Sequence, residues 1–169
     1  MKKFELTNEF IANRFGTKLF RIRALVEFGD VEAGELGGYV EKESNLGHDD
    51  NAWVYGNARV YDNAWVYGDA QVSGDARVCG DARVCGNGDY AYAHGFGSVN
   101  RTTTFFRLKD GGVGVRCGCF YGTLAQFRDK IRETHGETKK AQEYLMLADL
   151  MELRFEEDEN EVGNRKYVE

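Results

Sequence analysis

Three histidines and four cysteines are among the residues in this sequence that could ligate a metal or take part in acid–base or nucleophilic chemistry. The histidines are His48, His94 and His135. A catalytic zinc site needs three converging protein ligands, and such wide spacing does not predict convergence. The cysteines are Cys79, Cys85, Cys117 and Cys119. Their spacings match neither a zinc ribbon nor a Cys-x-x-Cys redox motif, so we predict free thiols and no metal site.

The middle of the sequence contains aromatic and arginine side chains, which are residue types typical of binding surfaces. Trp, Tyr and Arg dominate the residues that contribute most to protein–protein affinity, and arginine and aromatic rings also stack on nucleotide bases. We therefore predict a binding surface, no catalytic residues and no cofactor. The predicted surface contains Trp53, Tyr55, Arg59, Tyr61, Trp65, Tyr67, Arg77 and Arg83.

An internal repeat must position these side chains. Residues 51–86 read NAWVYG, NARVYD, NAWVYG, DAQVSG, DARVCG and DARVCG, which is one six-residue unit repeated six times. Each unit begins with Asn or Asp, has Ala and Val two residues apart, and ends in Gly or, once, in Asp62. A period of six is too long for a helical turn and fits a short strand followed by a corner, where Gly, Asn and Asp are favoured.

The repeat resembles the hexapeptide repeat of left-handed parallel β-helices, in which three units make one coil. In a pleated strand, Ala and Val two residues apart point to the same side, so we expect them to form the inner column. With 18 residues per coil, Trp53 stacks over Gln71 and Trp65 over Arg83. Arg59 stacks over Arg77. The residues of the predicted binding surface then face outward. Either the N-terminal segment or a second subunit covers part of this surface, or the surface is free to bind a partner.

The fold class predicted for the whole chain is mainly β. We expect an N-terminal β cap (1–38), a short left-handed parallel β-helix (39–98), a ββαα module (99–155) and an acidic tail (156–169). In the flanks of the repeat, Val40 and Leu46 fall in the alanine register. In the module, TTTFFRLKDGGVGVRCGCFY predicts two strands joined by a turn. Two helices follow: one runs from a Thr123–Gln126 capping box to Gly136, and another starts near Thr138, with Leu145, Ala148, Leu150 and Leu153 among its apolar positions.

Charge and hydropathy narrow the classes of partner. The chain has 22 Lys and Arg against 28 Asp and Glu, a net charge of −6, so we do not expect it to coat duplex DNA or to read a nucleic-acid sequence directly. No apolar run approaches the roughly 20 residues that span a bilayer, and no leader is recognisable at the N-terminus. We therefore expect a cytoplasmic protein without membrane contact. Because parallel coils have open ends, a homodimer or trimer is expected.

Nearly the whole chain resembles a family of bacteriophage and prophage β-helical proteins. The segments that carry the resemblance are LFRIRAL, GDVEAGELGGYVEKESNLG, NAWVYGNARVYDNAWVYGDA and RCGCFYGTLAQFRDKIRETHG. The resemblance implies a phage-encoded, non-enzymatic inhibitor that binds a bacterial defence protein. Its most specific form is a β-helical anti-CRISPR protein that acts on a type II RNA-guided nuclease in the host cytoplasm.

Two other functions stay open from the sequence. One is a sponge that sequesters a nucleotide immune signal in a pocket between subunits, lined by Arg77, Arg83 and aromatic rings. The other is a hexapeptide-repeat acyltransferase, in which His94 would be the general base. Coenzyme A binding and the effect of His94→Ala would test the acyltransferase.

Overall fold

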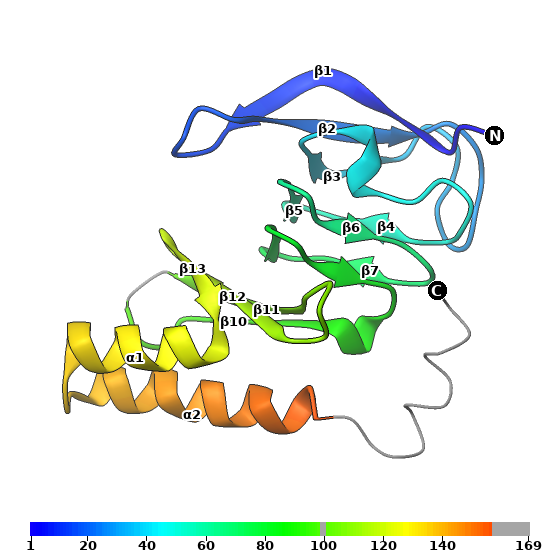
Figure 1. Ribbon diagram of the computed structural model, residues 1–169. Coiled ribbons are helices and arrows are strands. Elements are labelled where there is room, and N and C mark those ends of the chain that lie inside the picture. The colour runs from blue at the N-terminus through cyan, green and yellow to red at the C-terminus, as the bar shows by residue number, and fades with distance from the viewer. Residues whose placement is uncertain (99–100, 157–169) are drawn as a thin grey trace.

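The computed structural model describes residues 1–98 and 101–156 of the chain. It stacks three parts on one another: an N-terminal antiparallel hairpin, a stack of short parallel strands, and a C-terminal sheet that carries two helices (Figure 1). Of the acidic tail that the sequence predicts (156–169), residues 157–169 lie outside the described part of the chain. No helix within the described ranges is long and apolar enough to cross a membrane.

The N-terminal part is joined directly to one side of the strand stack. Strands β1 (Phe4–Ala12) and β2 (Lys18–Ala24) form the antiparallel hairpin, and β2 pairs with β3 (Leu36–Val40). Strand β3 then pairs in parallel with β5 (Arg59–Val60). The hairpin therefore continues a sheet that runs in the order β1-β2-β3-β5-β8, in which β8 is Arg77–Val78, and it covers one end of the stack.

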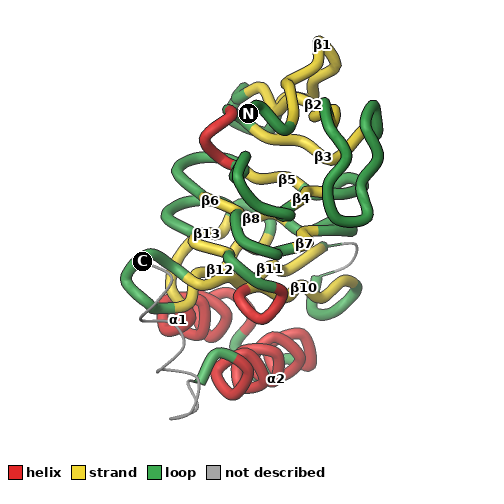
Figure 2. The backbone as a smooth tube through the Cα atoms, turned by 90° about the vertical axis from the view of Figure 1, so that its right-hand side faces the viewer, coloured by secondary structure: helices red, strands yellow, loops and turns green. Residues whose placement is uncertain are grey.

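Six two-residue strands make up the stack, and each starts six residues after the one before. They are β4 (Trp53–Val54), β5 (Arg59–Val60), β6 (Trp65–Val66), β7 (Gln71–Val72), β8 (Arg77–Val78) and β9 (Arg83–Val84). Parallel pairing joins β4 to β7, β5 to β8 and β6 to β9, so partners are 18 residues apart. These pairs confirm the predicted stacking of outward residues, and the tube in Figure 2 shows the chain winding through successive coils.

Alanine and valine side chains fill the interior of the stack, as the repeat predicts. Every repeat Ala and Val from Ala52 to Val84 is at most 1% exposed. Burying each Val contributes about 1.5–3 kcal/mol. The corners explain the residue that ends each of the first five units: Gly56, Gly68, Gly74 and Gly80 have positive φ, and Asp62 has a φ of 57°. Asp62 is tolerated there because Asp is among the few non-glycine residues that adopt this conformation.

The register of the first coil differs from the sequence prediction. Val40 pairs with Val60, and Leu46 forms a bridge with Val66, so both residues take the valine place and not the alanine place. The prediction was wrong because Leu46 and Val54 are eight residues apart instead of six. The buried Lys3 holds this longer corner, since its ammonium donates to the backbone oxygens of Asp50 and Ala52 at 3.0 and 2.7 Å.

The C-terminal part contains a four-stranded antiparallel sheet and two helices. Its elements are β10 (Tyr90–His94), β11 (Thr102–Arg107), β12 (Val113–Cys117), β13 (Phe120–Thr123), α1 (Leu124–His135) and α2 (Lys139–Arg154). Two short 3-10 helices, Glu43–Asn45 and Asn87–Asp89, precede and follow the coils. The predicted hairpin is β11–β12, and the predicted Thr123 capping box begins α1. Strand β10, within the residues assigned from sequence to the β-helix, pairs with β11.

A separate apolar core joins this sheet to the helices. Phe105, Val115, Phe127 and Tyr144 are all buried in it. Helix α2 contributes Ala141, Tyr144, Ala148 and Met151. The prediction that Leu150 and Leu153 belong to the apolar face was wrong, because both side chains are more than half exposed. The buried residues recur at a spacing of three and four along the helix, which places them on one side.

Candidate functional site

The eight predicted binding residues are divided among three sides of the coil stack. The side made by β4 and β7 carries Trp53, the side made by β5 and β8 carries Arg59 and Arg77, and the side made by β6 and β9 carries Trp65 and Arg83. The predicted surface is therefore not one patch. Its residues belong to a buried layer, a basic cavity and an exposed aromatic surface.

Two of the predicted binding residues are buried within the chain. Trp53 is 0% exposed, and its ring meets those of Phe4 and Phe28 edge-on, with centroids 6.4 and 5.3 Å away. Tyr61 is 6% exposed. The prediction that Trp53 and Tyr61 offer exposed binding surface is therefore wrong. The N-terminal segment covers Trp53, which was one of the arrangements that the sequence left open.

Trp65 and Tyr67 form the exposed aromatic feature of the coils. Their rings stack with centroids 3.8 Å apart and an interplanar angle of 18°. Trp65 is 41% exposed, and Tyr67 is half-buried. We call these two rings and the flanking cations the tryptophan face; its residues are Lys42, Trp65, Tyr67, Arg83 and Lys109.

Two open grooves of opposite charge flank Trp65. One, of about 590 Å³, is lined by Lys42, Arg83 and Lys109 together with Asp81. The other, of about 700 Å³, is lined on its polar side by Glu43, Asp49, Asp50 and His48. Arg83 is fixed at its place, since its guanidinium donates to the carbonyl oxygens of Asn63 and Ala82 at 2.8 and 2.9 Å. The aromatic ridge thus has a basic groove on one side and an acidic groove on the other.

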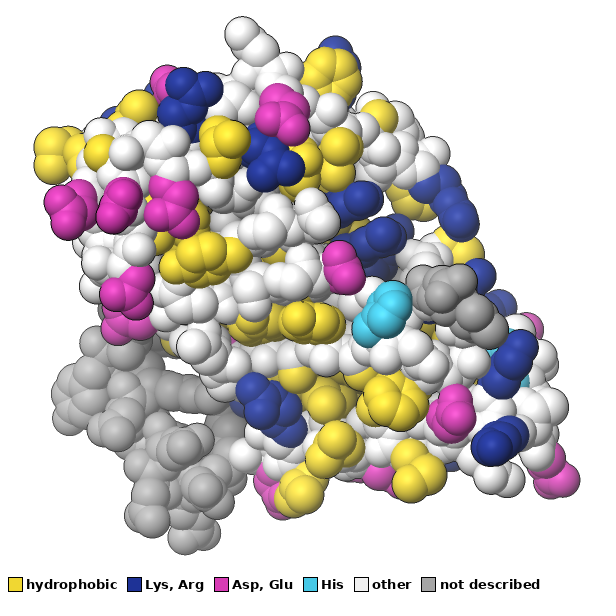
Figure 3. Space-filling model, turned by 180° about the vertical axis from the view of Figure 1, so that it is seen from behind, with side chains coloured by type: hydrophobic (Ala, Val, Ile, Leu, Met, Phe, Trp, Pro, Cys, Tyr) yellow, Lys and Arg dark blue, Asp and Glu magenta, His cyan; other side chains and the backbone are white. Residues whose placement is uncertain are grey.

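A second concave feature lies on the side of the stack made by β5 and β8. We call it the arginine cavity: about 80 Å³ lined by Arg14, Arg59, Tyr61, Arg77 and Arg116, together with Asn13, Leu19 and Gly118. Its arginines come from the turn after β1, from the two coil strands and from β12. Figure 3 shows Lys and Arg side chains gathered along this side of the molecule, between the N-terminal hairpin and the C-terminal sheet.

Burial and like charge set the electrostatics of the arginine cavity. Burial lowers the pKa of Arg59, and the positive charge of Arg77 lowers it further. Burial raises the pKa of Tyr61 well above its usual value and raises the pKa of the Cys79 thiol to about 12. Tyr61 and Cys79 are therefore neutral at physiological pH, so neither offsets the arginine charges.

The sequence identified Arg59 and Arg77 as binding residues but missed Arg14 and Arg116. Neither missed residue is in the repeat, and each reaches the cavity through an element that folds back on the coils. Alternation along β12 was a partial signal, because Val115 and Cys117 face the core of the C-terminal part and Arg116 faces the other way. The topology that brings that face to β8 could not be predicted from the repeat.

The two alternative functions, a nucleotide sponge and an acyltransferase, require other sets of residues. Arg77 and Arg83, expected in one nucleotide pocket, line two different cavities of this chain. His94, the expected general base of an acyltransferase, is exposed, and its Nδ1 lies 3.0 Å from the hydroxyl of Thr102. His48 stacks on Phe4 with centroids 4.3 Å apart, and His135 stacks on Tyr144. Each histidine thus has its own neighbours in a different part of the fold.

The cysteines are free thiols in distinct surroundings. Cys79 and Cys117 are buried, Cys85 is half-buried and Cys119 is exposed. The Cys85 thiol lies 3.1 Å from the carboxylate of Asp89. Within residues 1–98 and 101–156, no group of three or more His, Cys, Asp or Glu side chains is arranged to hold a metal ion.

The coil region is similar to a described repeat family. The family model named YdcK Beta solenoid repeat matches residues 52–68 and 70–86. These segments contain strands β4–β9, so the match supports a β-solenoid family for the repeat. No curated protein matches the sequence.

Proposed function

We propose that this chain is a non-enzymatic inhibitor that binds a bacterial defence protein through the tryptophan face. The observation that carries the proposal is the exposed Trp65–Tyr67 stack between a basic and an acidic groove. The defence protein that we propose is the effector nuclease of a type II CRISPR system. That choice is supported by the resemblance of the sequence to phage and prophage β-helical proteins.

The tryptophan face has the chemistry of a protein-binding surface. An aromatic pair at the centre of an interface buries a large apolar area against the partner. Trp contributes strongly to affinity at such positions. The charged grooves on either side favour one orientation of the partner and exclude surfaces with the wrong charge pattern. A fitting partner offers an apolar depression for Trp65, with carboxylates facing Arg83 and Lys109 and cations facing the exposed Asp49.

Further features belong to the same proposal. We propose that the coils are left-handed hexapeptide coils, that the protein is phage-encoded and that it acts in the host cytoplasm. We also propose assembly into a homodimer or trimer. Sedimentation of the full chain at several concentrations tests the assembly, and a single monomeric species at all of them would exclude it.

Affinity capture tests the proposed partner directly. The tagged full chain is mixed with a purified type II nuclease and its guide RNA, and the captured nuclease is quantified. We expect wild type to capture the nuclease and Trp65→Ala to capture much less. Phe96→Ala is the matched control, since Phe96 is a similarly exposed aromatic residue outside the coils. Equal capture by Trp65→Ala and wild type would exclude the tryptophan face, and no capture by wild type would exclude this nuclease.

A further inference from the structure

The arginine cavity concentrates positive charge in a chain whose net charge is −6. Arg59 and Arg77 are directly opposite each other on the parallel strands β5 and β8. Arg116 reaches the same cavity from β12, and Arg14 reaches it from the turn after β1. Like charges brought this close repel one another, so the free protein keeps them together at a cost in stability.

The guanidinium groups of this cavity have no anionic partner in the part of the chain that the structure describes. None of the four forms an ion pair or a side-chain hydrogen bond within residues 1–98 and 101–156. The Nε of Arg116 is buried and has no hydrogen-bond partner there. Asp75 raises the pKa of Arg59, but its effect is smaller than those of burial, Arg77, Tyr61 and Tyr39. A buried donor without a partner is costly and is satisfied when a ligand supplies an acceptor.

The shape of the cavity indicates the size of that ligand group. A volume of about 80 Å³ admits one tetrahedral anion but not a nucleobase. Three guanidinium groups, two from adjacent coil strands and one from β12, line the cavity. Guanidinium groups bind phosphate oxygens with paired, charge-assisted hydrogen bonds. A phosphate dianion has enough charge and oxygen atoms to engage all three, whereas a carboxylate offers two oxygens and a single charge.

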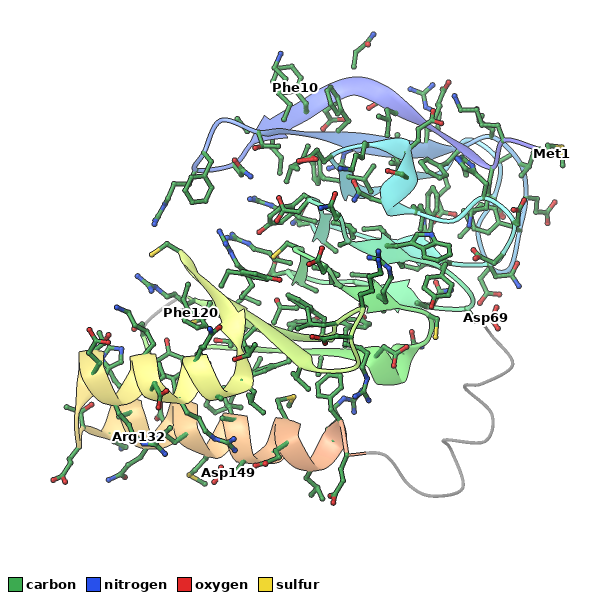
Figure 4. All side chains as sticks on the ribbon, viewed as in Figure 1. Met1, Phe10, Asp69, Phe120, Arg132 and Asp149 are labelled. Carbon is green, nitrogen blue, oxygen red and sulfur yellow. The ribbon has the colours of Figure 1, made fainter. Side chains whose placement is uncertain are left out.

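We propose that the arginine cavity binds a phosphate group through Arg59, Arg77 and Arg116. Arg14, from the turn after β1, and Gly118, from the turn between β12 and β13, complete the lining of this cavity. In Figure 4, nitrogen-tipped side chains gather in this region beside β5, above the labelled Phe120. The site is independent of the tryptophan face, because it is on another side of the coils.

Calorimetric titration of the full chain tests the proposal, with inorganic phosphate and adenosine diphosphate as probes at low salt. The variants are Arg77→Gln and Arg116→Gln. The matched control is Arg132→Gln, which removes the same charge from an exposed position on α1, outside both the cavity and the tryptophan face. We expect saturable binding to wild type, a loss of about tenfold or more in affinity in both cavity variants, since a charged hydrogen bond is removed, and little change in the control.

The two probes distinguish the sources of the phosphate group. Tighter binding of adenosine diphosphate than of inorganic phosphate assigns the site to a nucleotide, and equal binding assigns it to the phosphate group alone. Either result supports the site. The proposal is overturned if neither probe binds wild type saturably, or if Arg132→Gln weakens binding as much as the cavity variants do. Circular dichroism spectra of the variants confirm that they remain folded.

Discussion

Arg59 and Arg77 face each other in register on strands β5 and β8, and both line one cavity, with no carboxylate from residues 1–98 and 101–156 paired with either. Such a pair weakens the free protein, because like charges directly opposite on adjacent strands repel. A neutral residue at either position would remove this repulsion, and the corresponding position on β7 is the neutral Gln71.

The first prediction concerns this repulsion. Arg77→Gln should raise the melting temperature of the free protein in low-salt, phosphate-free buffer by about 1–4 °C, the size expected for a fraction of a kcal/mol to one kcal/mol in a domain of this length. The gain should shrink as salt screens the charges. Arg83→Gln should show no gain, because it breaks two hydrogen bonds to backbone carbonyls. Equal effects of the two variants on thermal melting would contradict this account.

The second prediction concerns the inner column of the coils. Val72 is 0% exposed, so Val72→Asp buries a charge without a partner and should abolish the cooperative melting transition. Asn57→Asp adds the same charge at an exposed corner and should leave the melting temperature within a few degrees of wild type. The measurement is thermal unfolding followed by circular dichroism. A folded Val72→Asp variant with an unchanged transition would show that the column is not the core.

The third prediction uses the two tryptophans of the chain. Trp53 is sealed by Phe4 and Phe28, whereas Trp65 is partly open to solvent. In acrylamide quenching, the variant Trp65→Phe, which retains Trp53, should be quenched weakly. The variant Trp53→Phe, which retains Trp65, should be quenched strongly. The reverse order would contradict the packing of the N-terminal segment against the coils.

The repeat predicts some features of the coils and not others. The six-residue period was enough to predict the inner Ala and Val column and the pairing of Trp65 with Arg83, because both depend on spacing within the repeat. It could not predict the burial of Trp53, since the cover comes from Phe4 and Phe28, which are outside the repeat. The register of Val40 failed for a related reason: a corner with two extra residues leaves no periodic signal.

The candidate sites show the same limit. Arg59 and Arg77 could be predicted to stack, because they are 18 residues apart in a regular coil. Arg116 could not be added to them from sequence, because its position depends on how β11, the strand paired with β12, packs against β8 and β9. Long-range contacts of this kind set the shape of the arginine cavity, and short-range patterns do not encode them.

The fourth prediction concerns alkaline pH. Burial raises the pKa of the Cys79 thiol from 9.0 to about 12, so the unfolded chain loses this proton at a lower pH than the folded protein does. Stability is therefore lost as the pH rises above about 9, by about 1 kcal/mol per pH unit from this group. Between pH 9 and 10, below the usual pKa of tyrosine, Cys79→Ala should reduce the loss measured by urea unfolding. Cys119→Ala, at an exposed site, should keep it. Identical pH slopes in Cys79→Ala and wild type would contradict the prediction.

The most direct test of the proposed inhibition is a DNA-cleavage assay with a guide-loaded type II nuclease. Wild type, Trp65→Ala and Phe96→Ala are titrated into the nuclease before the target DNA is added, and the cleaved fraction is measured. We predict that wild type and Phe96→Ala block cleavage at near-stoichiometric concentration. Trp65→Ala should need about tenfold more protein or fail to block, as expected when a central aromatic residue is removed from an interface. Full cleavage at saturating wild-type protein would contradict the account.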